Sequence, residues 1–286
     1  MVGTLASTAP LRLRPLEIGD LLDETFRMYR RHFYLFAGIS VILAIPSAAL
    51  SAYSVFALLG KLLQSFNPEQ TTEVIAPVDV ATLTSTLAIL GAGVLVSLAL
   101  APFTYAAVVY AVCESALGHE VTLWGVLRGV WRRYWAIAGY VILMVLMWVA
   151  FCLFPLWIWI QVSWVAVMPL LFVENLGLGA AMGRSWRLVE GRWWRTFLIL
   201  LLIFVLWYVV GIALGAVVQL ASFLLQIVLS PVLSTAILSA VSELLQALAT
   251  PILQIAIVLI YFDLRVRREG LDLFQLAQRV SAQLPA

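Results

Sequence analysis

Long apolar runs alternate with short charged segments along most of this chain. A helix needs about 20 apolar residues to cross the hydrocarbon core of a bilayer, and four runs exceed that length: 33–59, 83–113, 197–229 and 232–262. An uncharged block over 135–173 also fits two closely spaced spans, with Pro155 as the natural turn between them. The pattern therefore predicts spanning helices over most of the chain.

We predict an all-α integral membrane protein with about six transmembrane helices arranged as three hairpins. Pro231 marks the break between the last two helices. Several runs are longer than a bilayer needs, so we expect them to tilt or to protrude into water. The main alternative has four spans, with the short middle pair re-entering the membrane instead of crossing it.

Three segments that precede the odd-numbered spans resemble one another. They read LEIGDLLDETFRMYRRHF, VTLWGVLRGVWRRYW and LGLGAAMGRSWRLVEGRWW. Each starts with small or acidic residues, passes through an aromatic residue and an Arg, and ends in basic and aromatic residues. This predicts a threefold repeat, each copy an amphipathic interfacial helix followed by a hairpin. The alternative is three unrelated basic helices that each happen to precede a span.

The repeat divides a single membrane domain over 1–286 into smaller parts. The expected parts are an N-terminal tail 1–15, unit 1 over 16–120, unit 2 over 121–175, unit 3 over 176–263, and a cytoplasmic C-terminal tail 264–286.

The first of these segments shows why such a helix lies in the membrane surface. Leu21, Leu22 and Phe26 recur at helical spacing, while charged residues lie mostly on the other face. Arg side chains on such a helix reach the lipid headgroups, and guanidinium groups suit phosphate. We therefore expect membrane lipids, above all anionic headgroups, as partners of six roughly aligned arginines, unless these only mark topology: Arg27, Arg31, Arg128, Arg132, Arg187 and Arg192.

The basic residues also predict the orientation. The chain has 17 Lys and Arg, and with six spans every Arg falls on one side while Lys61 falls on the other. The positive-inside rule places the Arg side, and both termini, in the cytoplasm. Most tryptophans should lie in an aromatic belt on that side, whereas Trp157 and Trp159 should lie near the outer turn.

Composition excludes several classes of protein. Hydrophobic residues make up 64% of the chain and charged residues only 11%, too few charges to cover a soluble core of this size. Cys113 and Cys152 form no metal or redox spacing. We find no motif for nucleotides, nucleic acid or a catalytic nucleophile. We therefore expect no enzyme activity, no cofactor and no nucleic-acid partner.

Three motifs together resemble a known bacterial family. LRPLEIGDLLDETFRMYRRHF, FVENLGLGAAMGRSWRLVEGRWWRTFLILLL and IYFDLRVRREGLDL are similar to the glycerophosphoryl diester phosphodiesterase membrane domain. The resemblance implies an α-helical protein of the bacterial cytoplasmic membrane and transfers no catalytic residue. The phosphodiesterase barrel of the family's fused members needs about 250 residues, for which the predicted spans leave no room.

Four carboxylates are candidates for a polar centre or an ion path. Glu243 stands in an uncharged run, where carboxylates often mark ion or proton paths. Counting about 20 residues back from Asp263 instead favours an outer-interface position for Glu243. Glu114, Glu174 and Asp263 end the even-numbered spans. They either meet arginines of the interfacial helices in a shared centre or face water at the boundary.

These observations leave two function hypotheses. The first is a non-enzymatic scaffold, accessory or assembly subunit that binds a membrane protein partner. The second is a transporter or lipid-handling protein with a central cavity between the hairpins. A polar cavity that includes Glu243 or the inner acids would favour the second. A filled core with an exposed groove would favour the first.

Overall fold

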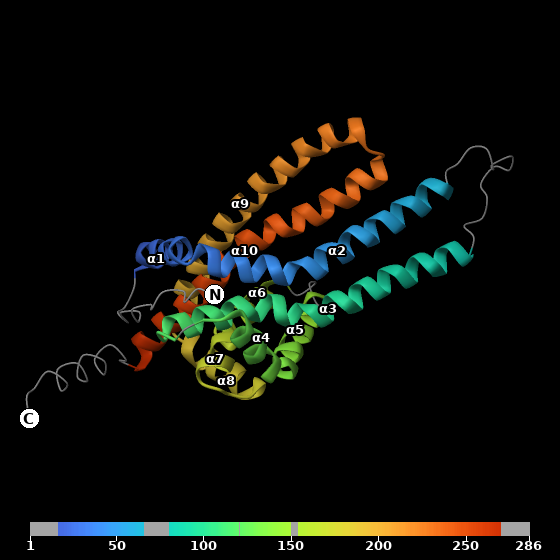
Figure 1. Ribbon diagram of the computed structural model, residues 1–286. Coiled ribbons are helices and arrows are strands. Elements are labelled where there is room, and N and C mark those ends of the chain that lie inside the picture. Colours follow the sequence, from blue (N-terminus) through green and yellow to red (C-terminus); the bar gives the residue numbers. More distant parts are fainter. Residues whose placement is uncertain (1–16, 66–79, 120, 150–153, 270–286) are drawn as a thin grey trace, which may run out of the picture.

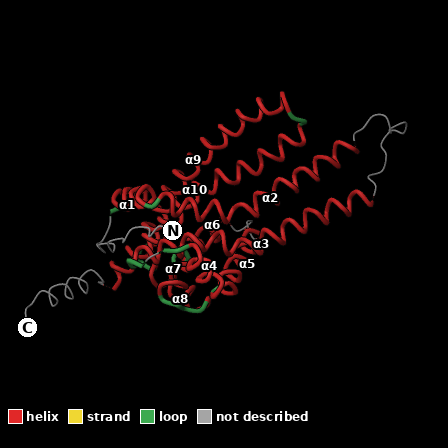
Figure 2. The backbone as a smooth tube through the Cα atoms, viewed as in Figure 1, coloured by secondary structure: helices red, strands yellow, loops and turns green. Residues whose placement is uncertain are grey.

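The computed structural model describes residues 17–65, 80–119, 121–149 and 154–269 of the chain, and every regular element in these ranges is an α-helix (Figures 1 and 2). The four longest helices are α2 (Phe33–Ser65), α3 (Val80–Ala116), α9 (Trp193–Val228) and α10 (Pro231–Glu269). The shorter helices are α1 (Ile18–Arg31), α4 (Leu123–Arg132), α5 (Tyr134–Val149), α6 (Phe154–Ser163), α7 (Val167–Val173) and α8 (Leu178–Val189).

The four long helices coincide with the four predicted apolar runs. Pro231 is the first residue of α10, where its missing N–H costs nothing. α10 continues past the expected boundary at 263 as far as Glu269, so residues 264–269 belong to the helix and not to a tail. An ion pair one turn apart between Arg265 and Glu269 supports this extension. The expected N-terminal tail, 1–15, and residues 270–286 of the expected C-terminal tail lie outside the described part.

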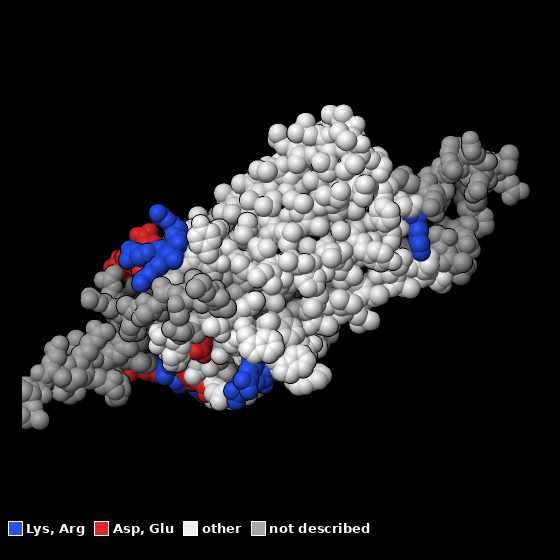
Figure 3. Space-filling view, in the orientation of Figure 1, with Lys and Arg blue, Asp and Glu red and all other residues white. Residues whose placement is uncertain are grey.

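Helix length and composition suggest a multi-pass membrane protein. Among the described residues, 5 helical segments are long and apolar enough to cross a membrane, or up to 6 if the bent pair α4–α5 is one span. Large apolar side chains are exposed along α9, as lipid contact would require. Figure 3 shows most of the charged side chains toward one end of the molecule, one blue patch near the other end, and a white surface over most of the length between them.

The C-terminal half of α10 forms the centre of the core. α10 packs against α1, α2, α3, α7, α8 and α9. Every residue from Gln254 to Leu264 is buried. Small buried side chains of α3, such as Ala107 and Ala111, let α3 approach α10 closely. Pro251 lies inside α10 and removes one helix hydrogen bond. Near it, Tyr29 of α1 donates to the carbonyl of Leu248 at 2.5 Å.

Three short helices immediately precede three apolar ones, α1 before α2, α4 before α5, and α8 before α9. Equivalent positions have equivalent burial. The residues eight positions before Phe33, Tyr134 and Trp193 are all buried, and they are Thr25, Val126 and Ser185. The second residue of each following helix is instead an exposed aromatic, and these are Tyr34, Trp135 and Trp194, at 89%, 85% and 73%.

A basic or titratable residue occupies the elbow in each case, directly before the apolar helix. Arg133 donates to the carbonyl of Leu176 at 2.7 Å, and Arg192 donates to the carbonyl of Arg267 at 3.2 Å. His32 holds the same position after α1, where burial and the neighbouring Arg31 lower its pKa. In the structure Arg192 is therefore equivalent to Arg133. The rough sequence alignment had paired Arg192 with Arg132, one position earlier.

The middle helices α5 and α6 are shorter than the other apolar helices, although Pro155–Val173, across α6 and α7, is one of the 5 segments long enough to span. α5 has 16 residues, about 24 Å at 1.5 Å per residue, against about 30 Å of hydrocarbon. In Figure 1, α5 and α6 extend less far along the molecule than α2, α3, α9 and α10. The turn was predicted at Pro155, but Pro155 lies in the first turn of α6, so that position is wrong. The connection between α5 and α6 falls at 150–153, outside the described residues.

Trp159 shows how shallow α6 is. It was expected near the outer turn, but its ring lies 4.5 Å from that of Trp186, and its carbonyl accepts a hydrogen bond from Trp193 at 3.2 Å. Trp186 and Trp193 flank the elbow on the Arg side, so the expectation for Trp159 is wrong. Phe154, the first residue of α6, is only five residues before Trp159, or about 8 Å along the helix. α6 therefore begins close to the Arg side.

Candidate functional site

Five of the six predicted headgroup arginines are exposed on the short helices or at their ends. Arg27, Arg128 and Arg187 occupy equivalent positions on α1, α4 and α8. Arg31 and Arg132, at the ends of α1 and α4, are also exposed. Arg192 differs, because it is half-buried and bound to the carbonyl of Arg267. The exposed five can reach headgroups, whereas Arg192 has a structural role.

Glu174 lies in a cluster of charged and hydroxyl groups between α8 and α10. It accepts a hydrogen bond from Arg184 of α8 at 3.2 Å and one from Tyr261 at 3.2 Å. Arg265 donates to Tyr261 at 3.0 Å, and Arg184 also pairs with Glu269. Burial acts to lower the pKa of Arg184. Its hydrogen bonds and ion pairs with Glu174 and Glu269 have the larger effect, so the pKa of Arg184 is raised. Glu174 is thus paired with an arginine of α8, the short helix that precedes α9.

Asp263 forms a separate pair of contacts on another face of α10. Its carboxylate accepts hydrogen bonds from Arg195 of α9 at 2.5 Å and from Arg267 of α10 at 2.9 Å. Arg195 belongs to the first turn of α9 and not to the preceding interfacial helix. Among the described contacts, Glu114 instead pairs with His119 at 2.7 Å, in the loop that follows α3. The three acids therefore do not meet in one centre within the described part of the chain.

A cavity of about 600 Å³ lies between α2, α3, α5, α6 and α10. It forms where the short α5 and α6 do not fill the space beside the longer helices. Its walls include apolar residues from α3 and α5, such as Leu100 and Met144. Val145 also lines it and is 48% exposed, which leaves one side open. A volume of this size suits a small organic ligand.

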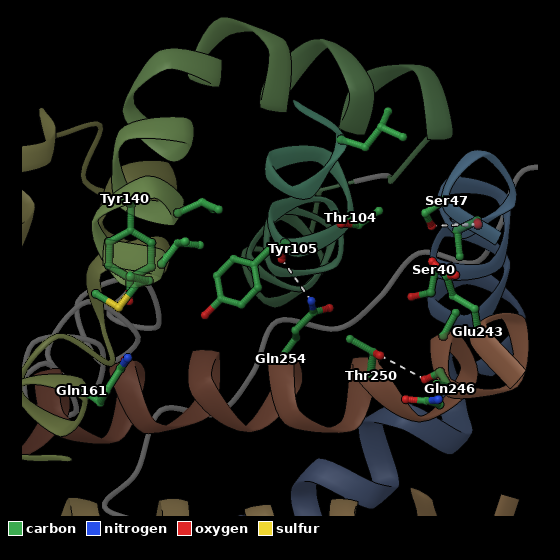
Figure 4. Close-up of a pocket in the computed structure, with 16 residues that line it drawn as sticks. Ser40, Ser47, Thr104, Tyr105, Tyr140, Gln161, Glu243, Gln246, Thr250 and Gln254 are labelled. Atoms are coloured by element: carbon green, nitrogen blue, oxygen red, sulfur yellow. Dashed lines mark hydrogen bonds between the residues drawn. The ribbon is translucent and has the colours of Figure 1, made fainter. Parts of the chain in front are cut away.

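Polar side chains line the cavity from all five helices. Figure 4 shows Ser40, Ser47 and Glu243 toward one end, Tyr140 and Gln161 toward the other, and Gln254 between them. Gln254 is 1% exposed, and its Nε2 donates to the carbonyl of Tyr105 at 3.0 Å. Its Oε1 and the Oγ of buried Ser40 have no hydrogen-bond partner among the described residues. Buried polar atoms normally find a partner, so the cavity presents unused acceptors.

Glu243 is the one charged residue among the described residues that line the cavity. It faces the same space as Ser47, which lies about 21 Å along α2 from its start. The count of 20 residues back from Asp263 assumed that Asp263 marks the inner membrane boundary. However, Tyr29 of the amphipathic α1 contacts α10 at Leu248, only about 8 Å from Glu243 along the helix. Glu243 therefore lies close, along α10, to the point where α1 contacts this helix.

Sequence reasoning singled out Glu243 but missed the polar residues around it. The signal was present, since Gln161, Gln246 and Gln254 stand inside apolar runs where amides are costly. What the sequence lacks is the pairing of helices that brings them together. The described residues hold no group of three or more His, Cys, Asp or Glu that could bind a metal ion.

The fold and the cavity define a helical protein with several helices of membrane-spanning length around a polar cavity. No family model, curated protein or solved structure matches this chain, so the resemblance to the glycerophosphoryl diester phosphodiesterase membrane domain stays a prediction.

Proposed function

We propose that this is a multi-pass protein of the bacterial cytoplasmic membrane that binds and transports, or otherwise handles, a small amphipathic molecule in the cavity. The observation that carries this proposal is the polar cavity that includes Glu243. A passive scaffold needs no such space, and an unfilled, partly polar interior lowers its stability. The cavity therefore favours the transport or lipid-handling hypothesis over the scaffold hypothesis.

The proposed arrangement is a diverged threefold repeat with both termini in the cytoplasm. The matching burial of Thr25, Val126 and Ser185 and the exposed aromatics that follow each elbow support the repeat. In this arrangement α1, α4 and α8 lie at the cytoplasmic surface, and their exposed arginines contact anionic headgroups. The aromatic residues Tyr34, Trp135 and Trp194 anchor the start of each hairpin at the interface.

The middle hairpin re-enters the membrane from the cytoplasmic side in this proposal. The contact between Trp159 and Trp186 and the length of α5 support this. A re-entrant pair is tolerated where it is buried in protein or lines a cavity, and α5 and α6 do line the cavity. The result is a cavity at membrane depth, open at one side next to the exposed, apolar Leu146.

The proposal is tested by filling the cavity. Ala44 and Ala247 line it from α2 and α10, so Ala44→Phe and Ala247→Phe should occupy part of the space. The matched control is Val205→Phe on the exposed face of α9. Full-length protein is extracted from native membranes in mild detergent, and retained molecules are measured by native mass spectrometry.

We expect wild-type protein and Val205→Phe to retain the same small amphipathic molecule, and both cavity variants to retain several-fold less at unchanged melting temperature. Equal retention by all four proteins, or no retained molecule in the wild type, would overturn the proposal.

A second candidate function, the scaffold, is favoured by a different surface. A hollow of about 300 Å³ lies between α9 and α10 and is lined by Trp207, Gly211 and Ala249, among others. Gly211 and Gly215 are four residues apart, and a Cβ added at either would meet no neighbouring atom. Small residues at this spacing let a second transmembrane helix approach closely. Crosslinking in native membranes tests this surface with the variant Gly211→Leu. If the variant keeps the crosslinked partner of the wild type, this surface is not where the partner binds.

A further inference from the structure

We infer that the molecule bound in the cavity carries an ammonium group attached to an apolar body. This inference rests on the proposed function, because it assigns the chemical class of the ligand to the same cavity. Its basis is the combination of one carboxylate, two unused acceptors and apolar walls in a single space.

The charge of the cavity selects a cation. Glu243 supplies a carboxylate, and the described lining includes no Lys, Arg or His to neutralise it. Within the described residues, no ion pair or hydrogen bond links that carboxylate to another side chain. A carboxylate at membrane depth is costly unless it has a counter-charge, and a bound cation would provide one. An anionic ligand would instead face repulsion from Glu243 at short range.

The hydrogen-bonding groups select a donor. Gln254 donates from Nε2 to the carbonyl of Tyr105, and its Oε1 acceptor has no partner in the described structure. The Ser40 hydroxyl is likewise unpartnered in the described structure, whereas the Ser47 hydroxyl donates to the carbonyl of Ala44 at 3.0 Å. A primary ammonium has three N–H donors and no acceptor. It therefore matches the Glu243 carboxylate and the Ser40 hydroxyl, which lie toward the same end of the cavity (Figure 4), better than an alcohol or a carboxylic acid does. Gln254 lies about 16 Å from Glu243 along α10, so its Oε1 remains for a second polar group of the ligand.

The apolar walls select an organic cation over a bare metal ion. Leu100, Val141, Met144 and Val145 cover the α3 and α5 side of the cavity. These side chains offer no oxygen ligands, and hard cations such as Mg²⁺ and Ca²⁺ require several. A cavity of about 600 Å³ also far exceeds the space that one ion needs. An aliphatic or aromatic body on the ammonium fills the rest.

The experiment compares three probes of nearly equal size by isothermal titration calorimetry. The probes are phenethylammonium, the neutral 2-phenylethanol and the anionic phenylacetate, each titrated into full-length protein in lipid nanodiscs. Empty nanodiscs give the blank for partition into lipid. We expect phenethylammonium to bind wild-type protein at least about tenfold more tightly than either other probe.

Two pairs of variants separate recognition from misfolding. Glu243→Gln removes the charge at constant shape and should weaken phenethylammonium about tenfold or more, leaving 2-phenylethanol unchanged. Glu190→Gln, an exposed carboxylate outside the cavity, is its control. Ser40→Ala should weaken phenethylammonium several-fold, whereas Ser47→Ala should not, because the Ser47 hydroxyl already has a partner.

The outcomes distinguish this inference from the proposed function. If 2-phenylethanol binds as tightly as phenethylammonium, or Glu243→Gln leaves phenethylammonium binding unchanged, the ammonium class is overturned and cavity binding stands. If no probe binds although native mass spectrometry detects a retained molecule, the inference again fails alone. If no probe binds and no molecule is retained, both proposals fail together.

Discussion

Arg195, in the first turn of α9, donates to Asp263 of α10 at 2.5 Å, and the Asp263 side chain is only 1% exposed. This pair joins the start of one long helix to the C-terminal half of its neighbour, on the side of the molecule where the arginines gather. It is the most buried ion pair in the described part of the chain, and its removal should affect stability more than that of any exposed pair.

Asp263→Asn should destabilise the protein by about 3 kcal/mol, because it leaves Arg195 and Arg267 beside a buried site without a counter-charge. Thermal unfolding in detergent measures the effect. The exposed ion pair between Arg268 and Glu190 is the control. Glu190→Gln should lower the free energy of unfolding by at most about 1 kcal/mol. Equal effects of the two substitutions would show that burial does not set the contribution of these pairs.

Gly129 on α4 should not tolerate a side chain. A Cβ at this position would lie 2.4 Å from Cζ of Tyr110 on α3. The Tyr110 ring also makes an edge-to-face contact with Phe172, at 5.2 Å between centroids, which limits how far it can move. Gly129→Ala should therefore cost about 1–3 kcal/mol through overpacking. Gly91→Ala, which meets no atom within 4 Å, should be neutral or stabilising by up to about 1 kcal/mol in the same unfolding assay.

The hydroxyl of Tyr29 should contribute to the docking of α1 on α10. Tyr29→Phe removes the hydrogen bond to the carbonyl of Leu248 and should cost about 1 kcal/mol. Tyr34→Phe is the control, because Tyr34 is almost fully exposed. Hydrogen exchange of the α1 amides should rise in Tyr29→Phe and stay unchanged in Tyr34→Phe. Unchanged exchange in both variants would mean that other contacts fix α1.

The orientation predicts which positions react with a membrane-impermeant thiol reagent in intact cells. In a Cys152→Ala background, where Cys113 remains and is buried, Lys61→Cys should be labelled from outside. Arg27→Cys, Arg128→Cys and Arg187→Cys should be labelled only after the membrane is opened, because the proposed orientation places these arginines on the cytoplasmic side. Labelling of Arg128→Cys and Arg187→Cys from opposite faces would contradict the threefold arrangement.

The long helices were predictable because their signal is local. Runs of more than twenty apolar residues, with Pro231 between the last two, place six of the eight helix ends within four residues, whereas α2 and α10 run six and seven residues longer at their C-terminal ends. The short helices were predictable for the same reason, since charge and apolar residues alternate at helical spacing before each elbow.

The break between α6 and α7 was not predictable, because it depends on a distant residue. Neither Pro nor Gly stands between Ser163 and Val167. Ser185 of α8 instead satisfies the backbone there, donating to the carbonyl of Ser163 at 2.8 Å and accepting from the N–H of Ala166 at 3.2 Å. The cavity was unpredictable for a similar reason, since its lining comes from five helices whose pairing no local pattern specifies. Glu114 shows the converse, because its position resembles that of Glu174 while its partner is the nearby His119.

The centre of the core is the last of the described helices to leave the ribosome. The helices that pack on α10, namely α1, α2, α3, α7, α8 and α9, are all synthesised before it, so the surfaces that will cover residues 254–264 stay unoccupied until α10 emerges. A chain that stops before α10 therefore exposes these apolar surfaces, and we expect it to be prone to aggregation and proteolysis.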